Sequence, residues 1–281
     1  MDLLQVIFMG IVQGLSEFLP ISSSAHLVFS SNIYKVFNDM PIHQQSNQEV
    51  FVDIMLHLGT LVAVLIFFRK EVLEIIQAVY VGIKTKDYSN YNCKLGLYIF
   101  LGTIITVLIA FPLNEVAEQL IYSPAIVGLL LIGTGFLLYF AEEFSKRIEN
   151  KKNEIDFKTS IIMAIAQGLA ALPGFSRSGL TIASALFNKN DRVSAGRYSF
   201  LLSIPIILGA SMVYPLIKID YHEFIGYDWK HIIIGTIVSG VVGYLCIKYF
   251  LKFLGKYSLK VFAYYCFIVG IISFIFFTKF I

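Results

Sequence analysis

Six long apolar stretches constrain the fold of this chain more than any other feature of its sequence. They lie at roughly 51–68, 95–113, 123–141, 197–217, 231–250 and 259–280. Each is close to the ~20 apolar residues that a helix needs to cross a bilayer. Only 15% of the residues are charged, whereas about a quarter are charged in a typical soluble domain. The sequence therefore predicts an all-α polytopic membrane protein, and nothing in it points to a nucleic-acid partner.

A segment of fifteen residues occurs twice in altered form, 154 positions apart. Residues 13–27 read QGLSEFLPISSSAHL and residues 167–181 read QGLAALPGFSRSGLT, with five identical positions. Polar, helix-breaking segments at corresponding positions of two hydrophobic halves indicate a binding site in a membrane protein. The alternative is a chance resemblance between apolar stretches of low diversity.

Each copy predicts a re-entrant hairpin, in which a helix, a broken tip and a half-length helix follow one another. The predicted helices are 3–18 and 24–34 around Pro20, and 159–172 and 178–187 around Pro173-Gly174. A helix of eleven residues is only ~16 Å long, about half the thickness of the hydrocarbon core. Broken backbone at membrane depth is tolerated where it is buried in protein or lines a wet cavity.

The distribution of basic residues predicts the topology. Of 22 Lys and Arg, 17 lie in the segments 69–94, 142–158, 188–197 and 248–260. We read these segments as loops, and the positive-inside rule assigns them to the cytoplasm. The other loops, 36–50, 114–122 and 218–230, and both termini then face outward. The first hairpin then begins and ends outside, and the second begins and ends inside. We therefore expect one membrane domain, 1–281, built of two inverted repeats at about 1–145 and 155–281, with both tips near the midplane.

Serine residues begin a helix in each tip, where exposed backbone N–H groups and the helix dipole bind phosphate-like anions. They are Ser22, Ser23 and Ser24 in the first copy, and Ser176 and Ser178 around Arg177 in the second. An arginine between two helix N-termini predicts an anion cradle, because a guanidinium bonds two phosphate oxygens at once. The alternative is that the serines are helix caps or interhelical contacts.

Charged and imidazole side chains accompany the serines. Arg177 at membrane depth indicates a functional site, although a structural pair with Glu17 is the alternative. Glu17 lies one helical turn after Gln13 and is a candidate for holding a divalent cation or for proton transfer. His26 follows Ser23 by three residues, which predicts a hydroxyl–imidazole pair of the kind that activates a nucleophile. A packed helix–helix contact is the alternative for His26.

Asp53 and His57 lie four residues apart at the start of the first long stretch. Either they contact the residues of the site and support them, or they lie at the outer membrane interface. The sequence leaves both readings open.

The motifs resemble those of a known family, the undecaprenyl-diphosphatases of the bacitracin-resistance type. In that family the first motif reads (E/Q)-G-x-x-E-F-L-P-x-S-S-(S/T)-G-H, and residues 13–26 are similar to it. PGFSRSGLT at 173–181 resembles the second motif, PGxSRSGxT. The segments LHLGT at 56–60 and SFLLSIP at 199–205 agree as well, so the resemblance spans nearly the whole chain.

The resemblance implies hydrolysis of a C55 isoprenyl diphosphate to the monophosphate and inorganic phosphate, which recycles the lipid carrier of bacterial cell-wall synthesis. It implies the bacterial plasma membrane, an active site open to the outer face, the inverted-repeat fold and a divalent cation, Mg²⁺ or Ca²⁺. The matching positions take the family's functional places. They are Glu17, Ser22, Ser23, His26, Ser176, Arg177, Ser178 and Thr181, and Ser24 completes the serine run.

Three positions depart from the family's usual residues. Gln13 stands where many relatives have glutamate, which puts a two-carboxylate metal site in doubt. Ala25 replaces the glycine before the histidine, and Ile105 replaces a proline that kinks the span. We therefore expect Gln13 to support the site. The departures at Ala25 and Ile105 raise the question whether the turn before His26 and the span around Ile105 keep the family's backbone shape.

The hypothesis from the sequence is a lipid diphosphatase in which Ser23 attacks phosphorus with help from His26, while Arg177 stabilises the phosphoryl charge. Direct attack by water, with Ser23 only binding phosphate, stays open. Mg²⁺ or Ca²⁺ near Glu17 would neutralise the diphosphate. The rival is a transporter that flips isoprenyl phosphate lipids through the same anion site, because broken helices at the midplane are a transporter architecture. The sequence leaves the oligomeric state open.

Overall fold

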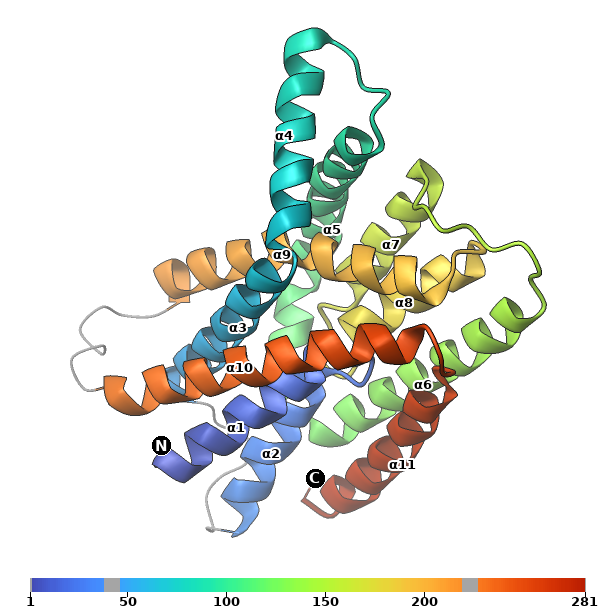
Figure 1. Cartoon of the computed structure of the whole chain (residues 1–281). Helices are drawn as coiled ribbons and strands as arrows, with labels where there is room; N and C mark the ends of the chain where they lie inside the picture. Colours follow the sequence, from blue (N-terminus) through green and yellow to red (C-terminus); the bar gives the residue numbers. More distant parts are fainter. Residues whose placement is uncertain (1, 38–45, 219–226, 281) are drawn as a thin grey trace.

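The computed structural model describes residues 2–37, 46–218 and 227–280 (Figure 1). Within these ranges the chain is helical apart from its turns and a single isolated bridge between Lys152 and Asn190. The elements are α1 (Leu3–Ser16), α2 (Ser23–Phe37), α3 (Asn47–Phe67), α4 (Arg69–Thr85), α5 (Tyr91–Ile121), α6 (Pro124–Lys146), α7 (Phe157–Leu169), α8 (Arg177–Phe187), α9 (Arg192–Lys218), α10 (Trp229–Leu254), α11 (Lys260–Phe277) and the 3₁₀ helix η2 (Thr278–Phe280).

Six of the described helices are long and apolar enough to cross a membrane, namely α3, α5, α6, α9, α10 and α11. Each coincides with one of the six predicted stretches, because a continuous apolar run of about 20 residues is stable in lipid only as a helix. The prediction of an all-α polytopic membrane protein is confirmed. The predicted helix breaks are also present, between α1 and α2 and between α7 and α8.

Two segments that the charge pattern assigned to loops are largely helical in the structure. Residues 69–94 contain α4, which packs on α5 through Ile75 while Ile76 is 60% exposed. Residues 114–122 are mostly the end of α5, which runs through Pro112 without ending. Asn114 Nδ2 donates to Glu118 Oε1 at 2.9 Å, one turn further on. Polar residues at this spacing support a helix, so the prediction of a loop there was wrong.

The helices pair across the two halves of the chain. α1 packs on α10, and correspondingly α7 packs on α5. α3 packs on α10 and α9 packs on α5, while α6 and α11 pack on each other. Two related halves that exchange equivalent contacts would pack in this way. The inverted orientation of the halves in a bilayer, and the repeat boundaries, stay predictions.

α7 begins at a helix cap outside the apolar spans. The Asp156 carboxylate accepts the Thr159 amide at 2.8 Å and pairs with Lys152 Nζ at 2.6 Å. Burial acts to raise the pKa of Asp156, but the hydrogen bonds from Lys152 and Thr159 outweigh it and lower the pKa from the usual 3.8 to about 2. The ionised carboxylate therefore stabilises this start of α7.

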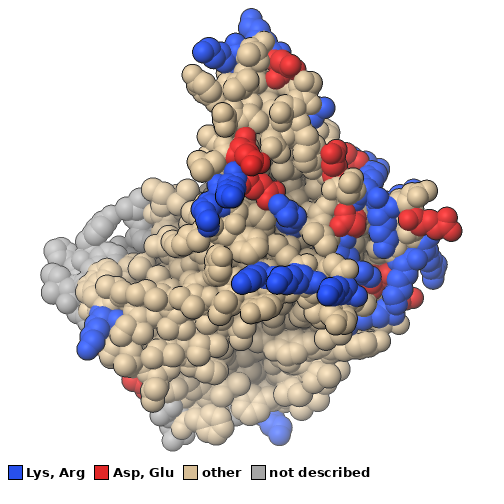
Figure 2. All heavy atoms as spheres, in the orientation of Figure 1, with Lys and Arg blue, Asp and Glu red and all other residues tan. Residues whose placement is uncertain are grey.

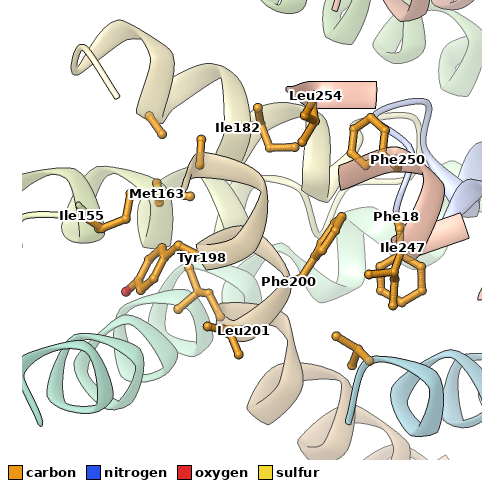
Figure 3. Close-up of a cluster of buried hydrophobic side chains, with 14 of the residues drawn as sticks. Phe18, Ile155, Met163, Ile182, Tyr198, Phe200, Leu201, Ile247, Phe250 and Leu254 are labelled. Carbon is orange, nitrogen blue, oxygen red and sulfur yellow. The ribbon is translucent and has the colours of Figure 1, made fainter. Parts of the chain in front are cut away.

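A cluster of buried apolar side chains lies behind the broken tips (Figure 3). It joins Phe18 of the first tip and Ile182 of α8 to Phe200 of α9 and Phe250 of α10. The Phe18 and Phe200 rings meet edge to face, with centroids 5.1 Å apart. Burial of a side chain of this size contributes about 1.5–3 kcal/mol. The cluster therefore fixes both tips against the long helices.

Lys and Arg gather toward the top and right of the molecule in Figure 2, and the rest of that face is mostly uncharged. The basic side chains lie around the upper hairpin of α4 and α5 and the right-hand ends of the other helices (Figures 1 and 2). A broad uncharged surface with charge at one end suits a membrane-embedded body with one basic face.

Candidate active site

The first tip begins where α1 ends. The Glu17 amide donates to Gln13 O at 2.9 Å, which closes the last turn. Ser22 then adopts a left-handed conformation, with φ 69°. Its hydroxyl accepts the Ala25 amide at 3.2 Å, in the manner of an N-cap for α2. Ala25 is buried in the first turn of α2 and is not among the described residues with a positive φ, so this turn does not require a glycine. α5 likewise runs unbroken through Ile105.

The second tip is shaped by Gly174 and a serine cap. Gly174 has φ 105°, and a Cβ there would lie 2.6 Å from Leu130 Cβ, so that a larger residue would be strained. Ser176 Oγ accepts the Gly179 amide at 3.1 Å and caps α8. The Ser176 amide in turn donates to Thr134 Oγ1 of α6 at 3.1 Å. These bonds fix the direction in which Arg177 leaves the backbone.

The structure brings the two tips together. Ser178 Oγ donates to Leu19 O at 2.9 Å, which links the second tip to the first. Arg177 Nη2 donates to Glu17 Oε1 at 2.6 Å, and Nη1 lies 3.4 Å from Ser199 O. The convergence of the tips is therefore as the repeat predicted. The ion pair with Glu17, which the sequence offered as the alternative role of Arg177, is also present.

Glu17 is the centre of the site. Its Oε2 atom accepts Ser23 Oγ at 2.7 Å and Gln13 Nε2 at 3.0 Å. His57 Nε2 lies 3.6 Å from the same oxygen. Since Oε1 binds Arg177, one carboxylate joins a hydroxyl, a guanidinium, an amide and an imidazole. The expectation that Gln13 supports the site agrees with this contact.

His26 does not lie where the predicted Ser23–His26 pair requires. Its Nδ1 lies 2.7 Å from Ser22 O, and its Nε2 lies 2.8 Å from the Tyr265 hydroxyl of α11. The His26 and Tyr265 rings are stacked, with centroids 5.6 Å apart. Since both ring nitrogens have other partners and Ser23 donates to Glu17, the expected hydroxyl–imidazole hydrogen bond is not formed. The three-residue spacing placed the two residues on one face but did not fix which atoms meet.

Most of the predicted phosphate-binding hydroxyls are buried and bonded within the tips. Ser22, Ser176, Ser178 and Thr181 are each at most 2% exposed. Ser176 and Ser178 share a hydrogen bond of 3.2 Å, and Thr181 Oγ1 donates to Arg177 O at 2.7 Å. These four residues hold the backbone of the tips in place. Ser24 differs, because it lines a cavity.

That cavity has a volume of about 440 Å³ and lies between α2, α3, the end of α5 and α9. Asp53 and His57 of α3 line it together with Ser24, and His57 also contacts Glu17. Asn114 and Glu118 of α5 also line it. The contribution of α5 to the cavity wall was not predicted, because residues 114–122 were expected to form a loop. The remaining wall is mainly apolar, as is typical of small-molecule sites.

Gln13 and Glu17 together fit a divalent cation in part. The buried Gln13 Oε1 has no hydrogen-bond partner among the described residues, and its amide lies beside the Glu17 carboxylate. Amide and carboxylate oxygens are ligands of Mg²⁺ and Ca²⁺. The described residues contain no group of three His, Cys, Asp or Glu that could hold a metal alone. Substrate oxygens and water would have to complete the coordination.

The fold and the site define a class: a polytopic membrane protein in which a carboxylate, a guanidinium, a hydroxyl and an imidazole meet between the helices. A model of the family described as bacitracin resistance protein BacA matches residues 6–272. The chain belongs to this family.

The relatives carry a common name. The undecaprenyl-diphosphatase of Halothermothrix orenii is 40% identical over 274 residues, covering 96% of either chain. That of Methanobrevibacter smithii is 39% identical, covering 98% of this chain and 97% of its own. Undecaprenyl-diphosphatase 1 of Pseudoalteromonas translucida is 34% identical and covers 99% of this chain. The resemblance seen in the motifs is therefore confirmed over the whole length.

Proposed function

We propose that this protein is an undecaprenyl-diphosphatase, which hydrolyses C55 isoprenyl diphosphate to the monophosphate and inorganic phosphate. The observation that carries the proposal is the meeting of Ser23 and Arg177 on the two oxygens of Glu17. A hydroxyl nucleophile, a proton acceptor and a guanidinium are the parts that phosphoryl transfer needs. Membership of the BacA family and the name shared by its relatives support the same activity.

Ser23 is the proposed nucleophile. Its hydroxyl already donates to Glu17 Oε2 at 2.7 Å, so the carboxylate is placed to accept the proton as Oγ attacks the terminal phosphorus. The Oγ–phosphorus bond forms, the bond from phosphorus to the bridging oxygen breaks, and the lipid monophosphate leaves. Water then cleaves the phosphoserine: its oxygen bonds to phosphorus, its proton goes to Ser23 Oγ, and inorganic phosphate leaves. Glu17 releases to the solvent the proton that it took from Ser23. In this scheme Glu17 replaces His26 as the group beside the nucleophile.

Arg177 stabilises the charge on the phosphoryl oxygens. Its guanidinium is only 16% exposed, and a charge-assisted hydrogen bond is stronger when water is excluded. Because Glu17 already balances the charge of Arg177, a diphosphate adds negative charge that the site does not offset. Glu17 and Gln13, together with oxygens of the substrate, would hold a divalent cation, Mg²⁺ or Ca²⁺, which would supply the missing positive charge. This requirement predicts loss of activity with a chelator.

The cavity is the proposed route of the substrate. It is lined by Asn114 and Glu118, which lie in a segment that the charge pattern assigns to the outer side. We infer that the diphosphate enters from the outer face of the bacterial plasma membrane and that both termini face outward. Cysteine labelling tests this topology, because Cys93, Cys246 and Cys266 are buried. Asp2→Cys in intact cells should react with an impermeant maleimide and Lys256→Cys should not, whereas the reverse result would contradict it.

Phosphate release from purified protein in detergent tests the function. Hydrolysis needs no sealed compartment, whereas lipid transport does, so release separates the diphosphatase from the transporter. We expect release to stop with chelator and to fall about 10³-fold or more in Ser23→Ala, which removes the nucleophile. Ser30→Ala on the same helix is the matched control. A fully active, folded Ser23→Ala would contradict the role of Ser23, and an inactive wild type would contradict the function.

A second pair of variants tests the guanidinium. Arg177→Lys keeps the charge that balances Glu17 but loses the fork that bonds two oxygens. We expect its activity to fall by about 10²–10³, the usual loss of one charge-stabilising donor. Arg147→Ala, at the end of α6, is the control. Equal activity of Arg177→Lys and the wild type would mean that only the charge matters.

A further inference from the structure

His57 contacts the centre of the site from a helix that neither motif contains. It lies in α3, and its Nε2 is 3.6 Å from Glu17 Oε2. Ser23 Oγ lies 2.7 Å from that same oxygen. The His57 side chain is 31% exposed and lines the cavity beside Ser24. A group that enters the cavity and approaches Ser23 therefore also approaches the imidazole.

The ring of His57 is held in one orientation. Its Nδ1 donates to Asp53 O at 2.8 Å, one turn earlier in α3. A hydrogen bond at one nitrogen of a histidine fixes which nitrogen is presented to the site. Here it presents Nε2 toward the Glu17 carboxylate.

The backbone of α3 around His57 is clamped to α10. Ser239 Oγ donates to Leu56 O at 2.8 Å, next to His57. A Cβ on Gly59 would clash with the backbone of α10 at Thr236 and lie 3.1 Å from Gly240 N. Small residues at a helix crossing let the backbones approach closely and rigidly. His57 is therefore positioned as firmly as the tips are.

His26 shares with His57 the contact of Nδ1 with the carbonyl one turn earlier, but its Nε2 faces a different group. Its ring nitrogens lie within hydrogen-bonding distance of Ser22 and Tyr265, and it is not among the residues that line the cavity. The imidazole that faces both the cavity and the carboxylate is that of His57.

We propose that His57 is a substrate-contacting residue, whose Nε2–H donates a hydrogen bond to the terminal phosphoryl group as this group meets Ser23. The proposal rests on the proposed diphosphatase function and adds a residue to it. The ligand is the phosphoryl end of the diphosphate, either in the lipid or in free inorganic diphosphate. Nε2 then bonds the phosphate while the ring keeps its orientation, so that His57 holds the group that Ser23 attacks.

The experiment compares three substitutions in the full-length protein in detergent. His57→Ala removes the donor, His57→Gln keeps a side-chain N–H at similar reach, and His231→Ala near the start of α10 is the matched histidine control. Phosphate release from C55 diphosphate gives kcat and KM separately. Inorganic diphosphate as a competitive inhibitor reports phosphoryl binding without the lipid. Thermal melting shows whether each variant is folded.

We expect His57→Ala to lower kcat/KM at least tenfold and to raise the inhibition constant of inorganic diphosphate. His57→Gln should stay within about fivefold of the wild type, since an amide replaces a hydrogen-bond donor, and His231→Ala should match the wild type. A folded His57→Ala with activity within twofold of the wild type overturns the proposal. So does an equal loss in the Ala and Gln variants, because a donor role is then excluded. An inactive wild type would instead contradict the function itself.

Discussion

The close crossing of α1 and α10 allows a quantitative prediction about activity, because this crossing sets the position of Glu17. Gly14 lies one turn before the tip, and a Cβ there would lie 2.7 Å from Ser239 O, 2.8 Å from Val242 Cβ and 2.9 Å from Gly243 N. Ordinary Cβ contacts begin near 3.4 Å. Gly14→Ala must therefore push the two helices apart by about 0.7 Å, since 3.4 minus 2.7 is 0.7.

The magnitude follows from that shift. Overpacking of this kind costs about 1–3 kcal/mol, which the better helix propensity of alanine offsets by up to about 1 kcal/mol. A misplacement of 1 Å at a reacting group can cost about 10² in rate. We therefore expect Gly14→Ala to lose at least tenfold in kcat, with a small decrease in Tm.

Gly209 of α9 is the matched control, because a Cβ there would meet nothing within 4 Å. Gly209→Ala should keep full activity and an equal or higher Tm. Phosphate release and thermal melting in the same detergent measure both variants. If Gly14→Ala were as active as Gly209→Ala, the helix crossing would not control the geometry of the site, and the reasoning would be refuted.

Three further predictions concern stability. Phe18→Ala should cost about 3–5 kcal/mol and lower the Tm, whereas Phe111→Ala, at a position 81% exposed toward the surface, should leave the Tm nearly unchanged. Asp156→Ala should lower the Tm at pH 7 by removing a cap worth about 1 kcal/mol. Because the pKa of Asp156 is about 2 in the folded protein and 3.8 ordinarily, the difference in Tm between variant and wild type should persist above pH 4 and shrink as the pH falls toward 2. A difference in Tm that does not depend on pH would contradict the role of the ionised carboxylate. Glu142→Gln should cost about 3–5 kcal/mol, because it leaves Arg192 beside a buried position without its ionic partner, and an unchanged Tm would count against that pair.

The sequence predicted the features that depend on local patterns. Continuous apolar runs identified the six spans, and Pro20 and Pro173 identified the tips, because a proline and a serine cluster stop a helix wherever they occur. The repeat also predicted that Glu17 and Arg177 lie at one site. Each of these inferences needed only a window of sequence and a period.

The features that the sequence did not predict depend on packing between distant helices. The spacing of Ser23 and His26 suggested a pair, but Tyr265 of α11 lies beside the imidazole instead. His57 was left with two open readings, and only the crossing of α3 with α10 places it at Glu17. α4 and the end of α5 were missed because charged residues were taken as a sign of loops. An amphipathic helix carries such residues on its polar face.

The packing of α10 on α1 and α3 has a consequence for how such a protein could arise. α10 belongs to the second half of the chain, yet it packs on α1 and α3 of the first half, while Arg177 reaches across to Glu17. A protein of half this length would hold Ser23 and Glu17 without Arg177 or the helix α10 that packs on α1 and α3. The predicted repeat therefore implies that a single-unit ancestor worked as a pair of chains, and fusion of the genes would have made an existing partnership permanent.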